Sequence, residues 1–156
     1  MTPEHFTFMQ GFLKERSGLV LGNDKGYLLE SRLTPIARRH DIKDLDELVA
    51  KAMSAPTEAL LVDITEAMTT NESFFFRDQK PFDLFENHVL PHLLEHRAFT
   101  KAFRIWSAAA SSGQESYSLA MILKEQAAKI PGWRTEIFGT DLSSEIIRKA
   151  ENGLYT

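Results

Sequence analysis

One stretch in the second half of the chain decides the fold, FRIWSAAASSGQESYSLA at residues 103–120. Residues 103–108 are mainly apolar, aromatic or β-branched, a composition that favours a β-strand. Small residues follow at 109–113, and apolar residues then recur at helical spacing from Leu119 to Leu123. A strand, a small-residue turn and a helix in this order predict the first half of a βαβ unit.

The residues that follow complete this unit. Pro131-Gly132 ends the helical pattern, and EIFGT at residues 136–140 predicts a second strand, parallel to the first. Ser143 is expected to cap a last helix that carries Ile146. Two parallel strands can neither bury both faces nor satisfy their edges. We therefore expect either that the chain is a fragment or that a second copy completes the sheet.

The residues before this stretch have a helical pattern. Thr2 and Pro3 are typical of a helix start, and apolar residues recur at helical spacing in several segments between Phe6 and Leu90. Pro35 lies inside one of these patterns and predicts a kink or a break. We predict an all-α domain at residues 1–80 and a partial α/β domain at residues 81–156.

The composition excludes several classes of protein. The chain has 156 residues, no cysteine, a formal net charge of -4 and 43% apolar residues, which is typical of a globular protein. No apolar run approaches the roughly 18 residues of a membrane span, and the start lacks the features of a signal peptide. The mild acidity argues against nucleic-acid binding, which needs clustered Lys and Arg. We expect a cytoplasmic protein with no membrane insertion.

Acidic residues near the strand ends indicate what kind of ligand would bind there. Ligands of open α/β sheets bind at the carboxyl ends of the strands, where small residues such as Gly113 let them approach the backbone. A carboxylate at Glu115 would repel phosphate and favour an amine or hydroxyls. Asp141 can accept hydrogen bonds from both hydroxyls of a ribose. S-adenosylmethionine fits this pair, since it has a ribose and an α-ammonium group but no phosphate. The alternative is that Glu115 is an exposed helix-start acid and Asp141 a turn residue.

The segment TTNESFFFRD at residues 69–78 is open to two interpretations. Its three phenylalanines cannot all face one side, so they form either a buried aromatic hinge or, in part, the wall of a ligand pocket. Asn71 and Ser73 are plain turn or cap residues on the first reading. Arg77 is either a surface residue whose stem covers apolar area or a clamp for a carboxylate.

Two groups of basic side chains also suggest sites. Arg32, Arg38 and Arg39 form a basic patch that favours docking to an acidic surface, or a solvated helix face with cations near its end. His88, His92 and His96 lie four residues apart, a spacing that metal sites use, but Pro91 interrupts the pattern and we expect no metal.

Three stretches together resemble the chemotaxis receptor methyltransferases of the CheR type. They are ITEAMTTNESFFFRD at 64–78, RIWSAAASSGQESYSLAM at 104–121 and GTDL at 139–142. The resemblance implies an all-α domain followed by a Rossmann-like class I methyltransferase domain. It implies transfer of a methyl group from S-adenosylmethionine to glutamates on the cytoplasmic helical bundle of chemoreceptors. The products are a γ-glutamyl methyl ester and S-adenosylhomocysteine.

The resemblance also implies roles for individual residues. The cofactor-binding set is matched by Asn71, Ser73, Arg77, Glu115 and Asp141, with Gly113 in the turn between them. Arg77 also matches an arginine at the reacting centre, where it would orient a substrate carboxylate. A glutamate with a pKa near 4.3 is ionised at neutral pH, so no general base is required.

The sequence departs from the family pattern at three points. Gln114-Glu115-Ser116-Tyr117 replaces the commoner Glu-Glu-Pro-Tyr, and Ser73 replaces threonine but keeps a hydroxyl. Family members also continue well past the Gly153–Tyr155 segment, so we expect a truncated chain with little activity alone.

Two other hypotheses remain open. One is a non-catalytic module that docks acidic helical bundles through Arg32, Arg38 and Arg39. The other is a domain-swapped homodimer formed through the exposed strand edges.

Overall fold

The computed structural model describes residues 1–155 and divides the chain into two units, Met1–Thr70 and Asn71–Thr156. This boundary lies ahead of the one expected between residues 80 and 81. The reason is that the intervening segment is hydrogen-bonded to the second unit: the Ser111 hydroxyl donates to the Asn71 carbonyl, and the Phe76 N–H donates to the Ser118 hydroxyl. The segment with the Asn71, Ser73 and Arg77 motif therefore belongs to the α/β unit.

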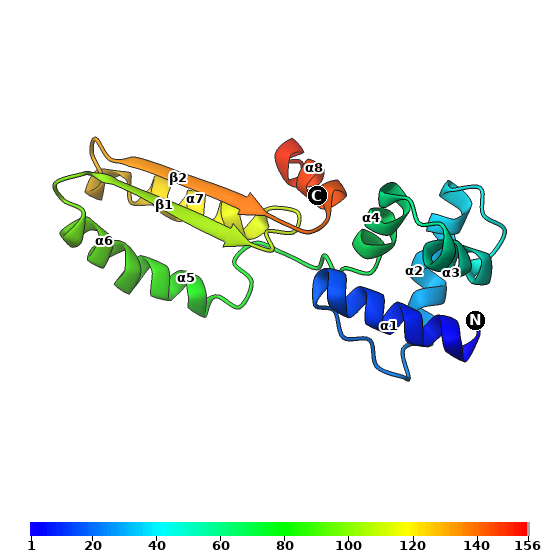
Figure 1. Ribbon diagram of the computed structural model, residues 1–156. Coiled ribbons are helices and arrows are strands. Elements are labelled where there is room, and N and C mark those ends of the chain that lie inside the picture. Colours follow the sequence, from blue (N-terminus) through cyan, green and yellow to red (C-terminus); the bar gives the residue numbers. More distant parts are fainter. Residues whose placement is uncertain (156) are drawn as a thin grey trace. The chain divides into compact units, whose positions relative to one another are not determined.

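The first unit is all-α, as predicted. Its helices are α1 (Pro3–Ser17), α2 (Gly26–Arg39), α3 (Leu45–Ser54) and α4 (Glu58–Ala67) (Figure 1). The Thr2 hydroxyl caps α1 by accepting the His5 N–H, and Gly18 ends the helix with a φ of 74°. The core of the unit consists of side chains from all of these helices, among them Met9, Leu13, Leu29, Leu33, Leu48, Leu60 and Ile64.

The predicted break at Pro35 is wrong, because α2 runs through this residue to Arg39. Leu33 and Ile36 on either side of the proline are buried in the core. Packing of this apolar face against the other helices offsets the hydrogen bond that the proline cannot donate.

The first helix of the second unit changes its pitch just before a proline. It consists of α5 (Lys80–Leu84), a π-helical turn (Phe85–Val89) and α6 (Leu90–His96). The Leu90 N–H donates to the Phe85 carbonyl, five residues back, which is the bond of a π-turn. Pro91 follows directly, at a place where its missing N–H is tolerated.

The rest of the second unit is the predicted βαβα arrangement. It contains β1 (Ala102–Ala108), α7 (Gln114–Glu125), a short 3₁₀ turn (Ala127–Lys129), β2 (Arg134–Thr140) and α8 (Ser144–Asn152). The strands are parallel, with Ile105 opposite Ile137. The cap at Ser143 is confirmed, since its hydroxyl accepts the Ile146 N–H.

Within the described residues of the second unit, helices cover one face of the sheet. Figure 1 shows α7 behind the two strands and no helix in front of them. The core lies on the covered side and combines Phe103 of β1 with Phe82, Phe85, Leu90, Ile122 and Leu123. Among residues 1–155, the helices are too short or too polar to cross a membrane.

Candidate functional site

The turn between β1 and α7 has a strained backbone. Ala109, Ser111 and Gly113 have φ angles of 58°, 51° and 95°, in the left-handed region. A non-glycine residue in this region costs free energy, and such residues cluster at functional sites. The turn is tied to the second strand, because the Ala110 N–H donates to the Thr140 carbonyl at 2.9 Å. The carboxyl ends of the two strands therefore form one rigid edge.

Asp141 joins the two loops at this edge. Its Oδ2 accepts the Ser111 N–H at 2.9 Å, and its Oδ1 accepts the Ser143 N–H at 3.0 Å. The geometry therefore shows the turn-residue role of Asp141. Each carboxylate oxygen has a second acceptor site, so the same side chain can also take a hydroxyl from a ligand. The ribose interpretation remains a prediction.

Ser111 is the residue that links the three segments of the site. Its N–H donates to Asp141, and its hydroxyl donates to the Asn71 carbonyl at 3.0 Å. Its side chain is buried. Sequence reasoning missed this role because the serine lies in a run of small residues and was considered only for its size. The available signal was the hydroxyl of Ser111 directly after three alanines, because a buried hydroxyl needs a hydrogen-bond partner.

Glu115 is positioned by the strand before it. The buried Ser107 of β1 donates its hydroxyl to Oε1 of Glu115 at 2.7 Å. Glu115 lies in the first turn of α7 and is exposed. A residue of the core strand thus orients Glu115, which is at the same time an exposed acid at a helix start, and its cofactor role stays a prediction. Its second oxygen is available to accept from a ligand cation.

The lack of a side chain at Gly113 serves packing. A Cβ at this position would lie 2.9 Å from Cβ of Ala150 and 3.0 Å from the Tyr155 hydroxyl. That hydroxyl donates to the Ser112 carbonyl, and burial raises the pKa of Tyr155. The space beside Gly113 is therefore filled by the protein itself. Ala108 and Ala109 are exposed and remain the places where a ligand can approach this turn.

The three phenylalanines of the 69–78 segment lie in different environments. Phe76 packs against Phe82 with ring centroids 5.3 Å apart, in the core of the unit. Phe75 packs edge-on against Tyr155, at 4.9 Å. Phe74 is 56% exposed. Phe76 thus packs against the core and Phe75 against Tyr155, but both are only partly buried and Phe74 is exposed, so the segment is not the fully buried aromatic hinge that one interpretation predicted.

Ser73 and Arg77 lie on this segment in different settings. Ser73 lines a hollow of about 380 Å³ together with Ser112, Gln114 and Lys149. Arg77 folds back on its own segment: Nη1 donates to the Glu72 carbonyl at 2.8 Å, and the guanidinium carbon lies 5.4 Å from the centre of the Phe74 ring. Both cofactor assignments stay predictions, and the carbonyl contact leaves most of the Arg77 donors available.

The three arginines of the basic patch differ in their surroundings. Arg32 is half-buried, and its Nη1 donates to the carbonyls of Met68 at 2.8 Å and Thr69 at 2.9 Å. These carbonyls follow the end of α4, where backbone carbonyls no longer have an N–H partner within the helix. Arg38 and Arg39 are exposed, and Arg39 lies 3.6 Å from an Asp63 oxygen. The structure thus gives Arg32 a capping contact and Arg39 an acidic neighbour within the unit, and the docking role of the three arginines stays a prediction.

Replacing Arg32 with methionine should destabilise the first unit by about 1.5–3 kcal/mol, because it removes hydrogen bonds from a charged donor and keeps the aliphatic stem. Arg38→Met on the same helix is the matched control and should change stability by less than about 0.5 kcal/mol. Urea denaturation followed by circular dichroism measures both. Equal effects of the two substitutions would show that the capping contacts contribute nothing specific.

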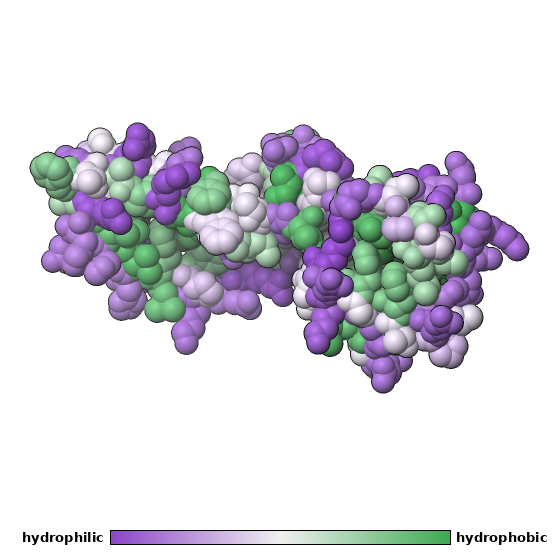
Figure 2. All heavy atoms as spheres, in the orientation of Figure 1, coloured by the Kyte–Doolittle hydropathy of each residue, from purple (hydrophilic) through white to green (hydrophobic). Residues whose placement is uncertain are grey.

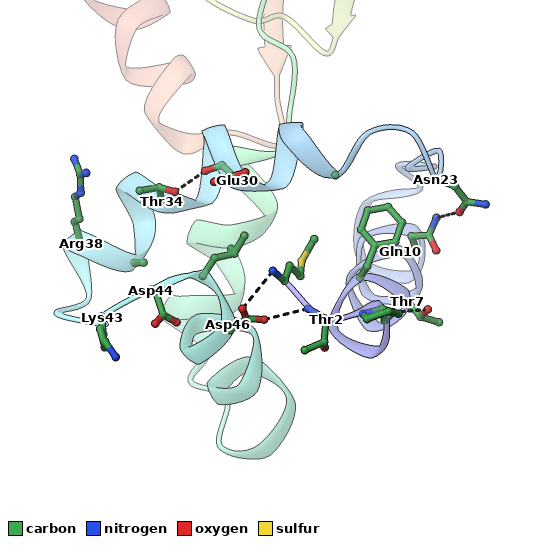
Figure 3. A pocket seen from close by; sticks show the side chains of 16 residues that line it. Thr2, Thr7, Gln10, Asn23, Glu30, Thr34, Arg38, Lys43, Asp44 and Asp46 are labelled. Carbon is green, nitrogen blue, oxygen red and sulfur yellow. Dashed lines mark hydrogen bonds and ion pairs between the residues drawn. The ribbon is translucent and has the colours of Figure 1, made fainter.

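A larger hollow of about 850 Å³ lies in the first unit, between α1, α2 and the start of α3 (Figure 3). Some of its polar groups have partners within the unit: Gln10 donates to Asn23, and Asp46 binds His5 and the N-terminal ammonium. The hydrogen bond from His5 is the main reason that the pKa of Asp46 is lowered. Arg38 and Lys43 lie at one end of the hollow. Its mixed charges and self-paired groups do not match the chemistry predicted for a nucleoside.

The histidine ladder does not assemble a metal centre in residues 1–155, where no cluster of three or more His, Cys, Asp or Glu side chains is placed to hold a cation. The rings of His92 and His96 instead stack with centroids 3.9 Å apart.

Taken together, the structure defines an all-α unit followed by an α/β unit with a small parallel sheet. Residues 71–156 match the family described as CheR methyltransferase, SAM binding domain, and residues 4–69 match CheR methyltransferase, all-alpha domain. The chain belongs to the CheR methyltransferase family.

Several curated proteins are similar to this chain. Chemotaxis protein methyltransferase 1 of Vibrio cholerae is 37% identical over 146 residues, which cover 92% of this chain and 52% of the relative. Chemotaxis protein methyltransferase 1 of Pseudomonas aeruginosa is 39% identical over 153 residues, which cover 96% and 55%. The chain therefore spans about half the length of the curated relatives it matches.

Proposed function

We propose that this chain binds S-adenosylmethionine at the carboxyl ends of β1 and β2 and serves glutamate O-methylation of chemoreceptors. The observation that supports it best is the pair of oriented acids, Asp141 and Glu115. Two backbone N–H groups orient the first, and the Ser107 hydroxyl orients the second. Two oriented acceptors at this edge suit hydroxyls and an ammonium group, and their negative charge disfavours a phosphate.

The residues fit the proposed cofactor in their chemistry. When bound, S-adenosylmethionine supplies the methyl group that a receptor glutamate accepts, leaving a γ-glutamyl methyl ester and S-adenosylhomocysteine. Asp141 would accept from the ribose hydroxyls, and Glu115 would pair with the α-ammonium group. Arg77 would orient the substrate carboxylate through its free guanidinium donors. No residue needs to remove a proton, because the attacking carboxylate is already ionised at neutral pH.

The proposal is tested by titrating the chain with S-adenosylhomocysteine, adenosine and ATP in a calorimeter. S-adenosylhomocysteine should bind and ATP should not, because the ATP phosphates would meet the Glu115 carboxylate. Glu115→Gln should weaken S-adenosylhomocysteine by about tenfold, the effect of one charge-assisted hydrogen bond, and leave adenosine unchanged. Glu125→Gln at the other end of α7 is the control. ATP binding as tight as that of S-adenosylhomocysteine would contradict the assignment.

The second candidate function is docking of this chain to the cytoplasmic helical bundle of a receptor. Arg38 supports it, because this exposed cation makes no hydrogen bond or ion pair within residues 1–155. Opposite charges at an exposed rim chiefly raise the rate of association. Capture by an acidic receptor bundle should therefore fall with Arg38→Ala/Arg39→Ala and with added salt, and stay unchanged with Asp141→Ala. Loss of capture with Asp141→Ala instead would tie docking to the cofactor edge.

A further inference from the structure

Ser107 is a polar residue in the core of the second unit. Side chains alternate along β1, so Ser107 lies on the same side as Phe103, which is the side that α7 covers. Ser107 is only 2% exposed. Its hydroxyl donates to Oε1 of Glu115, which lies in the first turn of α7 and is exposed. A buried donor is therefore paired with one oxygen of an exposed acid.

Stability alone does not explain this pairing. Hydrophilic side chains make up much of the surface in Figure 2, and an exposed carboxylate such as that of Glu115 is hydrated without any partner from the core. A buried hydroxyl, in contrast, must be hydrogen-bonded, because its burial otherwise costs free energy. Gly139 lies opposite Ser107 in the strand register and has no side chain to accept this hydroxyl. Alanine at position 107 would avoid the requirement altogether, so the serine is explained by its effect on Glu115.

The pairing also determines which oxygen of Glu115 meets a ligand. Oε1 accepts the Ser107 hydroxyl at 2.7 Å, and this buried hydroxyl would lose its partner if the carboxylate turned away. The carboxylate is therefore held in one orientation, in which Oε2 is the oxygen that accepts from a ligand. A negatively charged acceptor held in this way favours a positively charged donor over a neutral group of similar shape.

We propose that Ser107 is a positioning residue which, through Glu115, makes this site selective for adenosine thioethers that carry an amino group. The inference rests on the proposed function, in which Glu115 pairs with the α-ammonium group of the cofactor. It goes further by assigning this selectivity to a serine that is itself buried in the core. Such a residue affects ligands with a charged amino group and leaves ligands without one unaffected.

Calorimetric titration of the whole chain with S-adenosylhomocysteine and with methylthioadenosine tests the proposal. The second compound keeps the nucleoside and the thioether but lacks the amino acid. Ser107→Ala should weaken S-adenosylhomocysteine by about threefold to tenfold, the coupling usual for two residues in contact, and leave methylthioadenosine unchanged. Ser116→Ala is the matched control, because Oγ of Ser116 is also buried but has no hydrogen-bond partner within residues 1–155. This control should leave both affinities unchanged.

Two further measurements show whether Ser107 acts through Glu115. In a Glu115→Gln background, Ser107→Ala should add little, so that the two substitutions together weaken S-adenosylhomocysteine by about tenfold rather than by the product of their separate effects. In the free chain, NMR scalar couplings should report one conformation of the Glu115 side chain. Ser107→Ala should average these couplings over several conformations, and Ser116→Ala should leave them as they are.

The outcomes that overturn the role of Ser107 differ from those that overturn the proposed function. Equal weakening of both ligands by Ser107→Ala would show a merely structural role, and averaged couplings in the unsubstituted chain would show that Glu115 is not held. If Glu115→Gln removed the preference for the amino group but Ser107→Ala did not, the cofactor assignment of Glu115 would stand and the role of Ser107 alone would fail. Absence of S-adenosylhomocysteine binding to the unsubstituted chain contradicts the proposed function, and this inference with it.

Discussion

Asp141→Ala should lower the affinity for S-adenosylhomocysteine by about 10–100-fold, because hydrogen bonds to a charged acceptor contribute about 1.5–3 kcal/mol. The substitution removes the proposed ribose acceptor and the partner of the Ser111 and Ser143 N–H groups at once. The loop between β1 and α7 then loses its side-chain tie to Asp141 and keeps the backbone bond from the Ala110 N–H to the Thr140 carbonyl. Calorimetric titration measures the affinity, and thermal unfolding of the free chain measures the loss of stability.

Two further variants separate the parts of this effect. Ser111→Ala keeps the N–H that binds Asp141 and loses only the hydroxyl contact to the Asn71 carbonyl, so it should cause a smaller loss of affinity. Asp83→Ala removes an exposed carboxylate of α5 that accepts only from the Gln79 side chain, and it should leave affinity unchanged. If Asp141→Ala lowered stability but left the affinity intact, Asp141 would be a turn residue alone.

Leu33→Ala should lower the free energy of unfolding of the first unit by about 2–5 kcal/mol, the cost of removing a buried leucine side chain. Leu33 is fully buried at the centre of α2. A unit of this size has a total stability of only about 5–15 kcal/mol at most, so a large fraction of it would be lost. Val20→Ala is the control, because Val20 is 78% exposed.

The two tryptophans make this loss easy to locate. Both Trp106 and Trp133 lie in the second unit, whereas most of the helix content lies in the first. Leu33→Ala should therefore shift the urea midpoint seen by circular dichroism and leave the midpoint of tryptophan fluorescence in place. A common shift of both midpoints would show that the units unfold together, and no shift in either would contradict the assignment of Leu33 to the core.

Local pattern was enough to predict the elements around the site. The strand predicted from residue 103 begins at Ala102, and the caps at Thr2 and Ser143 are present, because each depends on neighbours a few residues away. The break predicted at Pro35 is absent for the complementary reason. The proline costs a local hydrogen bond, but the packing of α2 against α3 and α4 outweighs that cost.

The internal contacts of the site could not be predicted in the same way. Ser111 binds Asp141, thirty positions later, and Asn71, forty positions earlier. Arg32 reaches Met68, thirty-six positions away. A hydroxyl or guanidinium in a sequence shows that a partner is required, but the fold decides which carbonyl or carboxylate is near enough. The motif thus predicts candidate residues for the site, whereas the fold alone shows what each of them contacts.

The hydrogen bonds that orient Asp141 and Glu115 have a consequence for the entropy of binding. A carboxylate that rotates freely must lose rotamer freedom when a ligand arrives, at about 0.5–1.5 kcal/mol for a flexible side chain. Here two amide groups and one serine hydroxyl fix both carboxylates beforehand. That entropy is lost when the chain folds, so a nucleoside that bound as proposed would meet acceptors that already point in fixed directions. Selectivity at such an edge comes from rigid geometry, which discriminates sharply between ligands of similar charge and different shape.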